Sequence, residues 1–179
     1  MKKIGIVTDS HSSISQEEAK KLGIFVLPMP FYIDGECYYE SVTLSRELFF
    51  EKLTSGADIS TSQPSPTAVM EIWDKALEEY EKILYMPISS GLSSSYNTAM
   101  MLAQEEKYEG RVLVVDDGQV AAPLHQMILD TLDMIEKGYE AEHIRELLEK
   151  AGDRMMIYIA LQTLEFPKRS EEHTSELQS

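Results

Sequence analysis

Short apolar runs alternate with amphipathic helical segments along most of the chain, and this alternation constrains the fold more than any other feature of the sequence. The runs with strand character are brief and rich in β-branched residues, and they cover residues 3–7, 24–27, 82–88, 111–115 and 155–161. Apolar residues at helical spacing fill the intervals between them. Strands and helices that alternate with short connections predict an α/β fold, a parallel sheet with helices on both faces.

Local signals place several element ends. Ser15 has the spacing of a capping box before a helix, and Ser65-Pro66 sets an N-cap residue before a proline at the first helical position. Asp34-Gly35 stands between two aromatic-rich runs and suits the turn of a small hairpin. Further helices are expected at residues 44–53, 66–80, 96–107, 124–138 and 144–148.

Composition narrows the class of protein. The 179 residues are 43% apolar, and 16 basic against 31 acidic side chains give a net charge of −15. This charge would repel a phosphate backbone, so nucleic acid is not an expected partner. Cys37 is the only cysteine, which excludes an internal disulfide and favours the reducing cytoplasm. The first apolar run stops before Asp9, too short to span a bilayer, so we expect at most transient membrane contact.

Polar loops at the ends of predicted strands are the first places to look for a ligand. Four such loops are present, at residues 8–13, 60–65, 89–95 and 116–119. The second and third combine nine Ser or Thr residues with helix starts, an arrangement that suits an anion. Capping explains one hydroxyl per helix, Ser65 in one loop and Ser93 or Ser94 in the other. Both interpretations, an anion site and simple capping, remain open on the residues alone.

Carboxylates offer an alternative. Asp9 and Asp116 would both end strands, where two carboxylates could hold Mg²⁺ for phosphoryl transfer. Asp9 could instead brace its own loop through an Asx-turn. One histidine, His11, lies near a predicted strand end. The loop at Ser93, however, lacks the last glycine of a nucleophile elbow, and no Walker or dinucleotide pattern occurs. We therefore expect no catalytic residue, no metal and no cofactor.

The end of the chain differs in kind from the rest. Residues 169–179 have no apolar periodicity, and their letters resemble the translation of a common sequencing-adapter oligonucleotide. We interpret them as a non-native, disordered tail and leave them out of the fold. Residues 1–152 are expected to form a first α/β domain, and residues 153–168 to begin a second domain that is largely missing.

The motifs resemble those of the DegV proteins, a bacterial family of fatty-acid-binding proteins. The resemblance runs to about residue 168 and is carried above all by IVTDS at 6–10, TSQPSP at 61–66 and SSGLS at 89–93. It implies two α/β domains that clasp a long-chain fatty acid. It also implies a partner, the catalytic subunit of a fatty acid kinase, which would phosphorylate the bound carboxylate. The chain itself would then be a lipid carrier and not an enzyme.

The resemblance also implies site residues. Thr61 and Ser93 would hydrogen-bond the carboxylate. The pocket around them would be shaped by Ser62, Gly91 and Ser94 and supported by Asp9, Ser10 and Ser90. One departure from the family is Asp117, where members often have serine, because it adds negative charge near the proposed carboxylate site.

Overall fold

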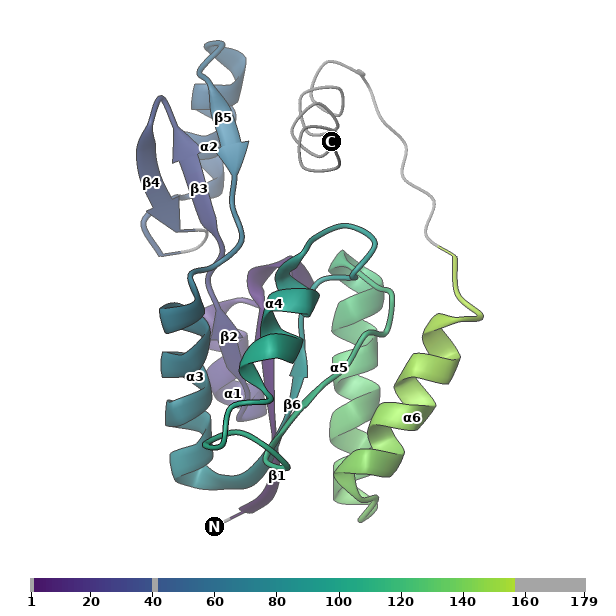
Figure 1. Ribbon diagram of the computed structural model, residues 1–179. Coiled ribbons are helices and arrows are strands. Elements are labelled where there is room, and N and C mark those ends of the chain that lie inside the picture. Colours follow the sequence, from purple (N-terminus) through teal and green to yellow (C-terminus); the bar gives the residue numbers. More distant parts are fainter. Residues whose placement is uncertain (1, 40–41, 157–179) are drawn as a thin grey trace, which may run out of the picture.

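A four-stranded parallel sheet lies at the centre of the computed structural model, which describes residues 2–39 and 42–156 (Figure 1). The strand order is β2-β1-β6-β7. The bounds are β1 Lys2–Asp9, β2 Phe25–Leu27, β6 Tyr80–Met86 and β7 Val112–Val114. Strand β1 is central, because its Val7 pairs with Phe25 on one side and with Tyr85 on the other. The predicted α/β fold with a parallel sheet is confirmed.

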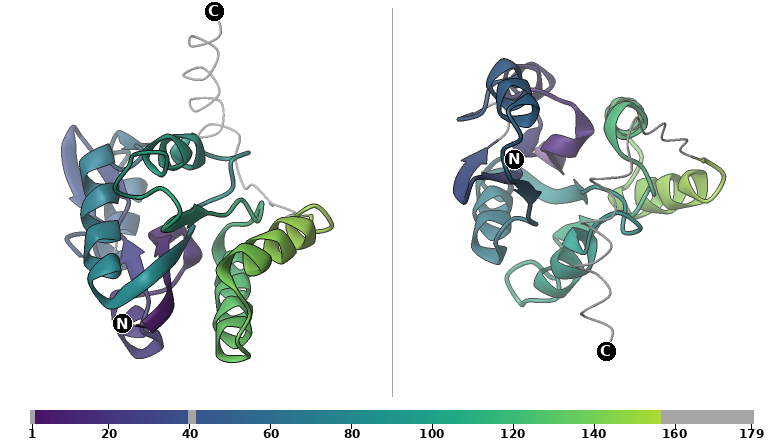
Figure 2. Two further views of the ribbon diagram at one scale, coloured as in Figure 1. Left: turned by 60° about the horizontal axis from the view of Figure 1, so that its bottom comes forward. Right: turned by 90° about the horizontal axis from the view of Figure 1, so that it is seen from above.

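Helices cover both faces of this sheet, as predicted (Figures 1 and 2). One face carries α3 (Pro66–Glu79) and α4 (Ser95–Leu102). The other carries α1 (Gln16–Leu22), α5 (Ala121–Glu136) and α6 (Ala141–Gly152). Neighbouring residues of β1 serve opposite cores, since Ile6 packs with the α5 side and Val7 with the α3 side. In the described ranges, no helix has the length and apolar character that crossing a bilayer requires.

Aromatic side chains organise the core under α3. The Trp73 ring is fully buried and makes edge-to-face contacts with Tyr85 and Tyr108, at centroid distances of 5.3 and 5.2 Å. At the other end of β6, Tyr80 covers Gly5 so closely that a Cβ on this glycine would lie 2.6 Å from the tyrosine ring. A side chain at position 5 would therefore push Tyr80, the first residue of β6, away from β1.

A second, antiparallel sheet extends from the parallel one (Figure 1). Its order is β4-β3-β5, and α2 lies between β4 and β5 in sequence. The bounds are β3 Pro30–Ile33, β4 Glu36–Tyr39, α2 Arg46–Thr54 and β5 Ile59–Thr61. The predicted hairpin turn is confirmed, because Asp34 and Gly35 both have positive φ angles, 52° and 84°. Strand β5 was not predicted, and it changes the setting of loop 60–65.

That loop was expected to follow a strand of the parallel sheet, and this expectation was wrong. Thr61 instead ends β5 and pairs with Phe31 of β3 in the small sheet. Helix α4 is also shorter than predicted, because it ends at Leu102 and a series of turns follows to residue 111. These turns bury Tyr108 against Trp73, and this tertiary contact outweighs the helical propensity of residues 103–107.

Several predictions fall on the end of the chain. The strand at 155–161 lies outside the described residues except for Met155 and Met156, which are in no strand. The beginning of a second domain at 153–168 is described only as far as residue 156, and the tail at 169–179 lies wholly outside the described residues. These predictions remain predictions.

Candidate ligand-binding site

A pocket of about 190 Å³ is lined by residues of the small sheet and of the segments that follow strands of the parallel sheet, and it contains the hydroxyls singled out by the sequence. Thr61 and Ser62 enter from the end of β5, and Ser93 enters from the loop between β6 and α4. The lining is completed by His11, Met29, Pro30, Phe31, Gln63, Ile88 and Leu92. The structure therefore brings together residues that lie more than thirty positions apart in the sequence. Their contact with a carboxylate stays a prediction.

Backbone and side-chain hydrogen bonds fix the Thr61 side of the pocket. The pairing of β5 with β3 sets Thr61, and the Ser62 amide donates to the carbonyl of Pro30 at 3.4 Å. The Ser62 hydroxyl donates to the carbonyl of Gln63 at 3.1 Å. The Thr98 hydroxyl of α4 donates to Oε1 of Gln63, also at 3.1 Å. This last bond ties the end of the small sheet to the helix that follows Ser93.

Hydrogen bonds at the start of α4 fix the Ser93 side of the pocket. The amide of Ser93 donates to the carbonyl of Ser89 at 3.2 Å, and the Oγ of Ser93 accepts from the Ser95 amide at 3.2 Å. The hydroxyls of Ser93 and Ser95 are 2.8 Å apart. Ser94 occupies the N-cap position, but its side chain makes no capping bond. Ser93 therefore satisfies the helix start while it also lines the pocket, so the capping and binding interpretations are compatible.

The other predicted residues of this loop do not line the pocket. Gly91 donates its amide to the Ser89 hydroxyl at 3.2 Å, and Ser90 donates its amide to Oδ1 of Asp116 at 3.3 Å. Ser94 is exposed at the helix start. These three residues shape the loop that carries Ser93 and do not face the cavity themselves.

Asp9 and Ser10 hold pocket residues in place. The Asp9 carboxylate is fully buried, and its Oδ2 accepts from the amide of Ile88 at 2.9 Å. Its Oδ1 accepts from the His11 amide at 2.9 Å and lies 3.2 Å from Nδ1 of the same residue. The Ser10 hydroxyl accepts from the Met29 amide at 3.2 Å. Three of the lining residues are thus fixed by the two residues predicted to support the pocket.

The two carboxylates of the magnesium alternative take part in hydrogen bonds within the protein. Both oxygens of Asp9 accept backbone amides, and Oδ1 of Asp116 accepts the amides of Ser90 and Gly118. Within residues 2–39 and 42–156, no group of three or more His, Cys, Asp or Glu side chains is arranged to hold a metal ion. The carboxylates of Asp9 and Asp116 thus brace the loops that contain them.

Asp117 is turned into the protein, away from the pocket lining. It is 1% exposed, its Oδ1 accepts from the Gln119 amide at 2.9 Å, and its Oδ2 has no hydrogen-bond partner among the described residues. Burial, reinforced by the charges of Asp116 and Asp9, raises the pKa of Asp117 to about 6. An aspartate at position 117, where family members often have serine, therefore affects the stability of the fold more directly than it affects the charge around a ligand.

We expect Asp117→Asn to stabilise the protein in a pH-dependent way. The folded-state pKa lies above the ordinary value of 3.8, so the folded state holds the proton more tightly and loses stability as the pH rises through this interval. Asparagine cannot ionise. The difference in unfolding free energy between variant and parent should therefore grow by about 2–3 kcal/mol from pH 3.5 to pH 8. Urea denaturation at both pH values measures it.

Met101→Ala provides the control, since it changes an exposed side chain without an ionisable group and should give the same difference at both pH values. A constant difference for Asp117→Asn as well would show that this carboxyl group titrates normally in the folded protein.

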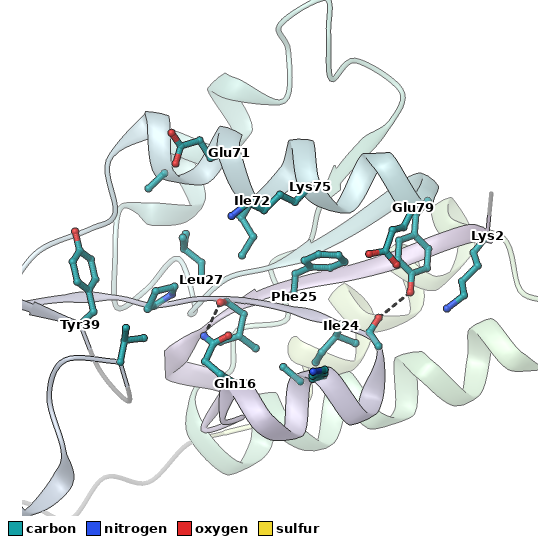
Figure 3. A pocket seen from close by; sticks show the side chains of 18 residues that line it. Lys2, Gln16, Ile24, Phe25, Leu27, Tyr39, Glu71, Ile72, Lys75 and Glu79 are labelled. Atoms are coloured by element: carbon teal, nitrogen blue, oxygen red, sulfur yellow. Dashed lines mark hydrogen bonds between the residues drawn. The ribbon is translucent and has the colours of Figure 1, made fainter.

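A larger hollow of about 810 Å³ follows the outer edge of β2 between α1 and α3 (Figure 3). Its floor includes Phe25, Leu27 and Ile72, and its rim carries both lysines and glutamates. Gln16 reaches the edge of the strand, where Nε2 donates to the carbonyl of Val26 at 2.9 Å. None of the predicted site residues lines this groove, so it is separate from the hydroxyl pocket.

The sequence interpretation missed part of the pocket. Gln63 lies inside the TSQPSP motif but was not assigned a role, and His11 was noted only for its place near a strand end. The signal for His11 was its spacing from Asp9, because a carboxylate two residues earlier can hold both the amide and the ring.

Comparison with known proteins identifies the family of this chain. A sequence profile described as "Uncharacterised protein, DegV family" matches residues 3–170. A DegV domain-containing protein of Deinococcus radiodurans is 33% identical over 164 residues, which cover 91% of this chain and 58% of the relative. The chain thus spans less than two thirds of the length of this relative.

Solved structures agree with the fold. A structure described as "Fatty Acid Binding of a DegV family Protein from Thermus thermophilus" has a TM-score of 0.83 and 32% identity, over 93% of this chain and 59% of that one. A Thermotoga maritima protein, described as revealing fatty acid binding function, has a TM-score of 0.73 and 25% identity, over 84% and 55%. From the profile match and the sequence identities together, the chain belongs to the DegV family.

Proposed function

We propose that this chain forms the part of a fatty acid carrier that binds the head group, with Thr61 and Ser93 as donors to the carboxylate. The observation that carries the proposal is the shared pocket, which is lined both by the hydroxyl residue at the end of β5, Thr61, and by Ser93 of the loop after β6. The relatives described as fatty-acid-binding support the ligand class. Hydroxyl donors suit a carboxylate because each hydrogen bond to a charged acceptor contributes about 1.5–3 kcal/mol.

The apolar part of the lining would contact the first carbons of the acyl chain. Met29, Phe31, Ile88 and Leu92 surround the hydroxyls, so the carbons next to the carboxylate would lie against apolar side chains. A cavity of about 190 Å³ is much smaller than the 300–1,000 Å³ typical of pockets for drug-sized ligands. A long acyl chain would therefore extend beyond the described residues.

The carrier role includes a partner. We propose that the bound acid is presented in the cytoplasm to the catalytic subunit of a fatty acid kinase, so that this chain supplies substrate and performs no chemistry itself. The family resemblance supports this step. The net charge of −15 is consistent with the absence of a nucleic acid partner, and membrane contact would be transient.

Removal of either hydroxyl tests the proposal. In a version of the chain extended to the length of its relatives, Thr61→Ala and Ser93→Ala should each weaken oleate binding about tenfold or more, because each removes a donor to a charged group. Isothermal titration measures the affinity, and thermal melting checks that each variant is folded.

An exposed hydroxyl next to the site provides a matched control. Ser60→Ala changes the neighbour of Thr61, which does not line the pocket, and this variant should bind oleate like the parent. Parental affinity in both Thr61→Ala and Ser93→Ala would overturn the assignment of the carboxylate site.

A further inference from the structure

The outer edge of β2 is an open strand edge at the floor of the larger groove (Figure 3). Among the described residues, β2 pairs with β1 alone. The carbonyl of Val26 faces the open side, because it accepts from Nε2 of Gln16 at 2.9 Å. The amide of a strand residue points to the same side as its carbonyl, so the Val26 amide faces this side as well. An edge with open backbone groups is a template for a further strand.

Apolar side chains flank this edge on both sides. Ala19 of α1 and Ile72 of α3 line the two walls, and Phe25 and Leu27 belong to the floor. A segment that extends the sheet beyond β2 would place successive side chains alternately against the two walls. A helix suits this floor less well, since its backbone groups are already bonded to one another and would leave the edge of Val26 without partners.

The rim of the groove carries three lysines that form no ion pair in residues 2–39 and 42–156. They are Lys2, Lys20 and Lys75, and all three are exposed. Glu71 and Glu79 also line the rim, which therefore has three positive charges against two negative ones. The chain as a whole has a net charge of −15. The balance of charge is thus reversed at the groove, and this favours an acidic partner.

We propose that this groove binds an extended segment of a partner protein, in which a short apolar core is flanked by acidic residues. The segment would add a strand to the outer edge of β2. A second copy of this chain fits poorly, because its own β2 is recessed between the same two helices, and these would collide before the edges came within 4.7–4.9 Å. The proposal goes beyond fatty acid binding, since no residue of the hydroxyl pocket lines this groove.

The test uses the 179-residue chain and a capped synthetic peptide in which alternating valine and threonine residues are flanked by two glutamates at each end. NMR titration should show saturable binding, with the amides of Phe25–Leu27 among those that shift most. A peptide with lysines in place of the glutamates should bind about tenfold more weakly. N-methylation of the central valine should weaken binding several-fold, because it removes a backbone donor from the added strand.

Charge variants of the rim provide the second arm. The double variant Lys20→Glu, Lys75→Glu should weaken binding of the acidic peptide about tenfold, and Glu71→Lys should strengthen it several-fold. Lys3→Glu is the matched control, since it makes the same change on β1 at an exposed residue that does not line the groove, and it should bind like the parent. The spectra also show whether each variant is folded.

Several outcomes would overturn the proposal. Equal binding of the acidic and basic peptides would do so, as would largest shifts outside β2, α1 and α3. Shifts of Phe25–Leu27 that depend on protein concentration without peptide would identify a second copy as the occupant. Phosphatidylglycerol vesicles test the remaining source of negative charge. If the parent sediments with them, the double variant does not, and the acidic peptide shows no saturable binding, the groove is a membrane contact.

Discussion

The 179-residue chain should bind oleate orders of magnitude more weakly than a version extended to the length of its relatives. The described pocket of about 190 Å³ would hold, on the proposed function, a head group and only the first carbons of an acyl chain. Each CH₂ that moves from water into an apolar site contributes about 0.8 kcal/mol, so several methylenes left in water cost several kcal/mol. Hydrogen bonds from Thr61 and Ser93 are too few to compensate.

Titration of both versions with oleate and with octanoate measures this effect. The short acid should bind the two versions with similar affinity, because most of its length fits near the head group, and it serves as the control. Light scattering should also show more self-association of the 179-residue chain. Its large exposed apolar side chains include Leu92, Met101 and Met156, which are 53%, 73% and 75% exposed. Equal affinities for oleate would show that residues beyond this chain are not needed for the site.

Trp73→Ala should lower the free energy of unfolding by about 3–5 kcal/mol, the largest effect we expect from a single substitution in the described core. The ring is fully buried between α3 and β6 and contacts both Tyr85 and Tyr108 edge to face. Its removal would leave a cavity bounded by two large aromatic rings, which cannot collapse to fill the space without moving β6. Chemical denaturation followed by tyrosine fluorescence or circular dichroism measures the loss.

A graded series sharpens this prediction. Trp73→Phe should cost less, since it keeps ring contacts and removes the Nε1 donor, which has no hydrogen-bond partner among the described residues. Met101→Ala changes a side chain that is 73% exposed and should alter stability by less than about 0.5 kcal/mol. A loss below about 1 kcal/mol for Trp73→Ala would show that the core under α3 relaxes around the missing ring.

The parallel sheet could be predicted because its strands are read locally. Val112–Val114 is a continuous apolar run, which is typical of a strand covered on both faces. Strand β5 could not be read in the same way, since Ile59–Thr61 has one apolar residue and owes its conformation to pairing with β3, far away in sequence. The early end of α4 has the same cause, because a distant Trp73 decides where Tyr108 lies.

The candidate site shows a similar division. The rule that ligands bind beyond the carboxyl ends of parallel strands directs attention to Ser93, which follows β6 and lines the pocket. The same rule selected Thr61 for a wrong reason, since this residue ends a strand of the small sheet. The prediction that Thr61 and Ser93 act together therefore came from the resemblance of the motifs and not from periodicity. His11 was not assigned to the pocket, because a histidine in a polar turn has no pattern of its own until Asp9 is seen to hold its ring.

The make-up of the pocket has a mechanical consequence. Thr61 ends β5 of the small sheet and Ser93 follows β6 of the parallel sheet, so the distance between their hydroxyls depends on the relative orientation of the two sheets. The hydrogen bond from Thr98 of α4 to Gln63, which follows β5, is one side-chain link that restrains this orientation near the pocket. A head group that hydrogen-bonds both hydroxyls would link the two sheets, and the small sheet would then be less mobile when a ligand is bound.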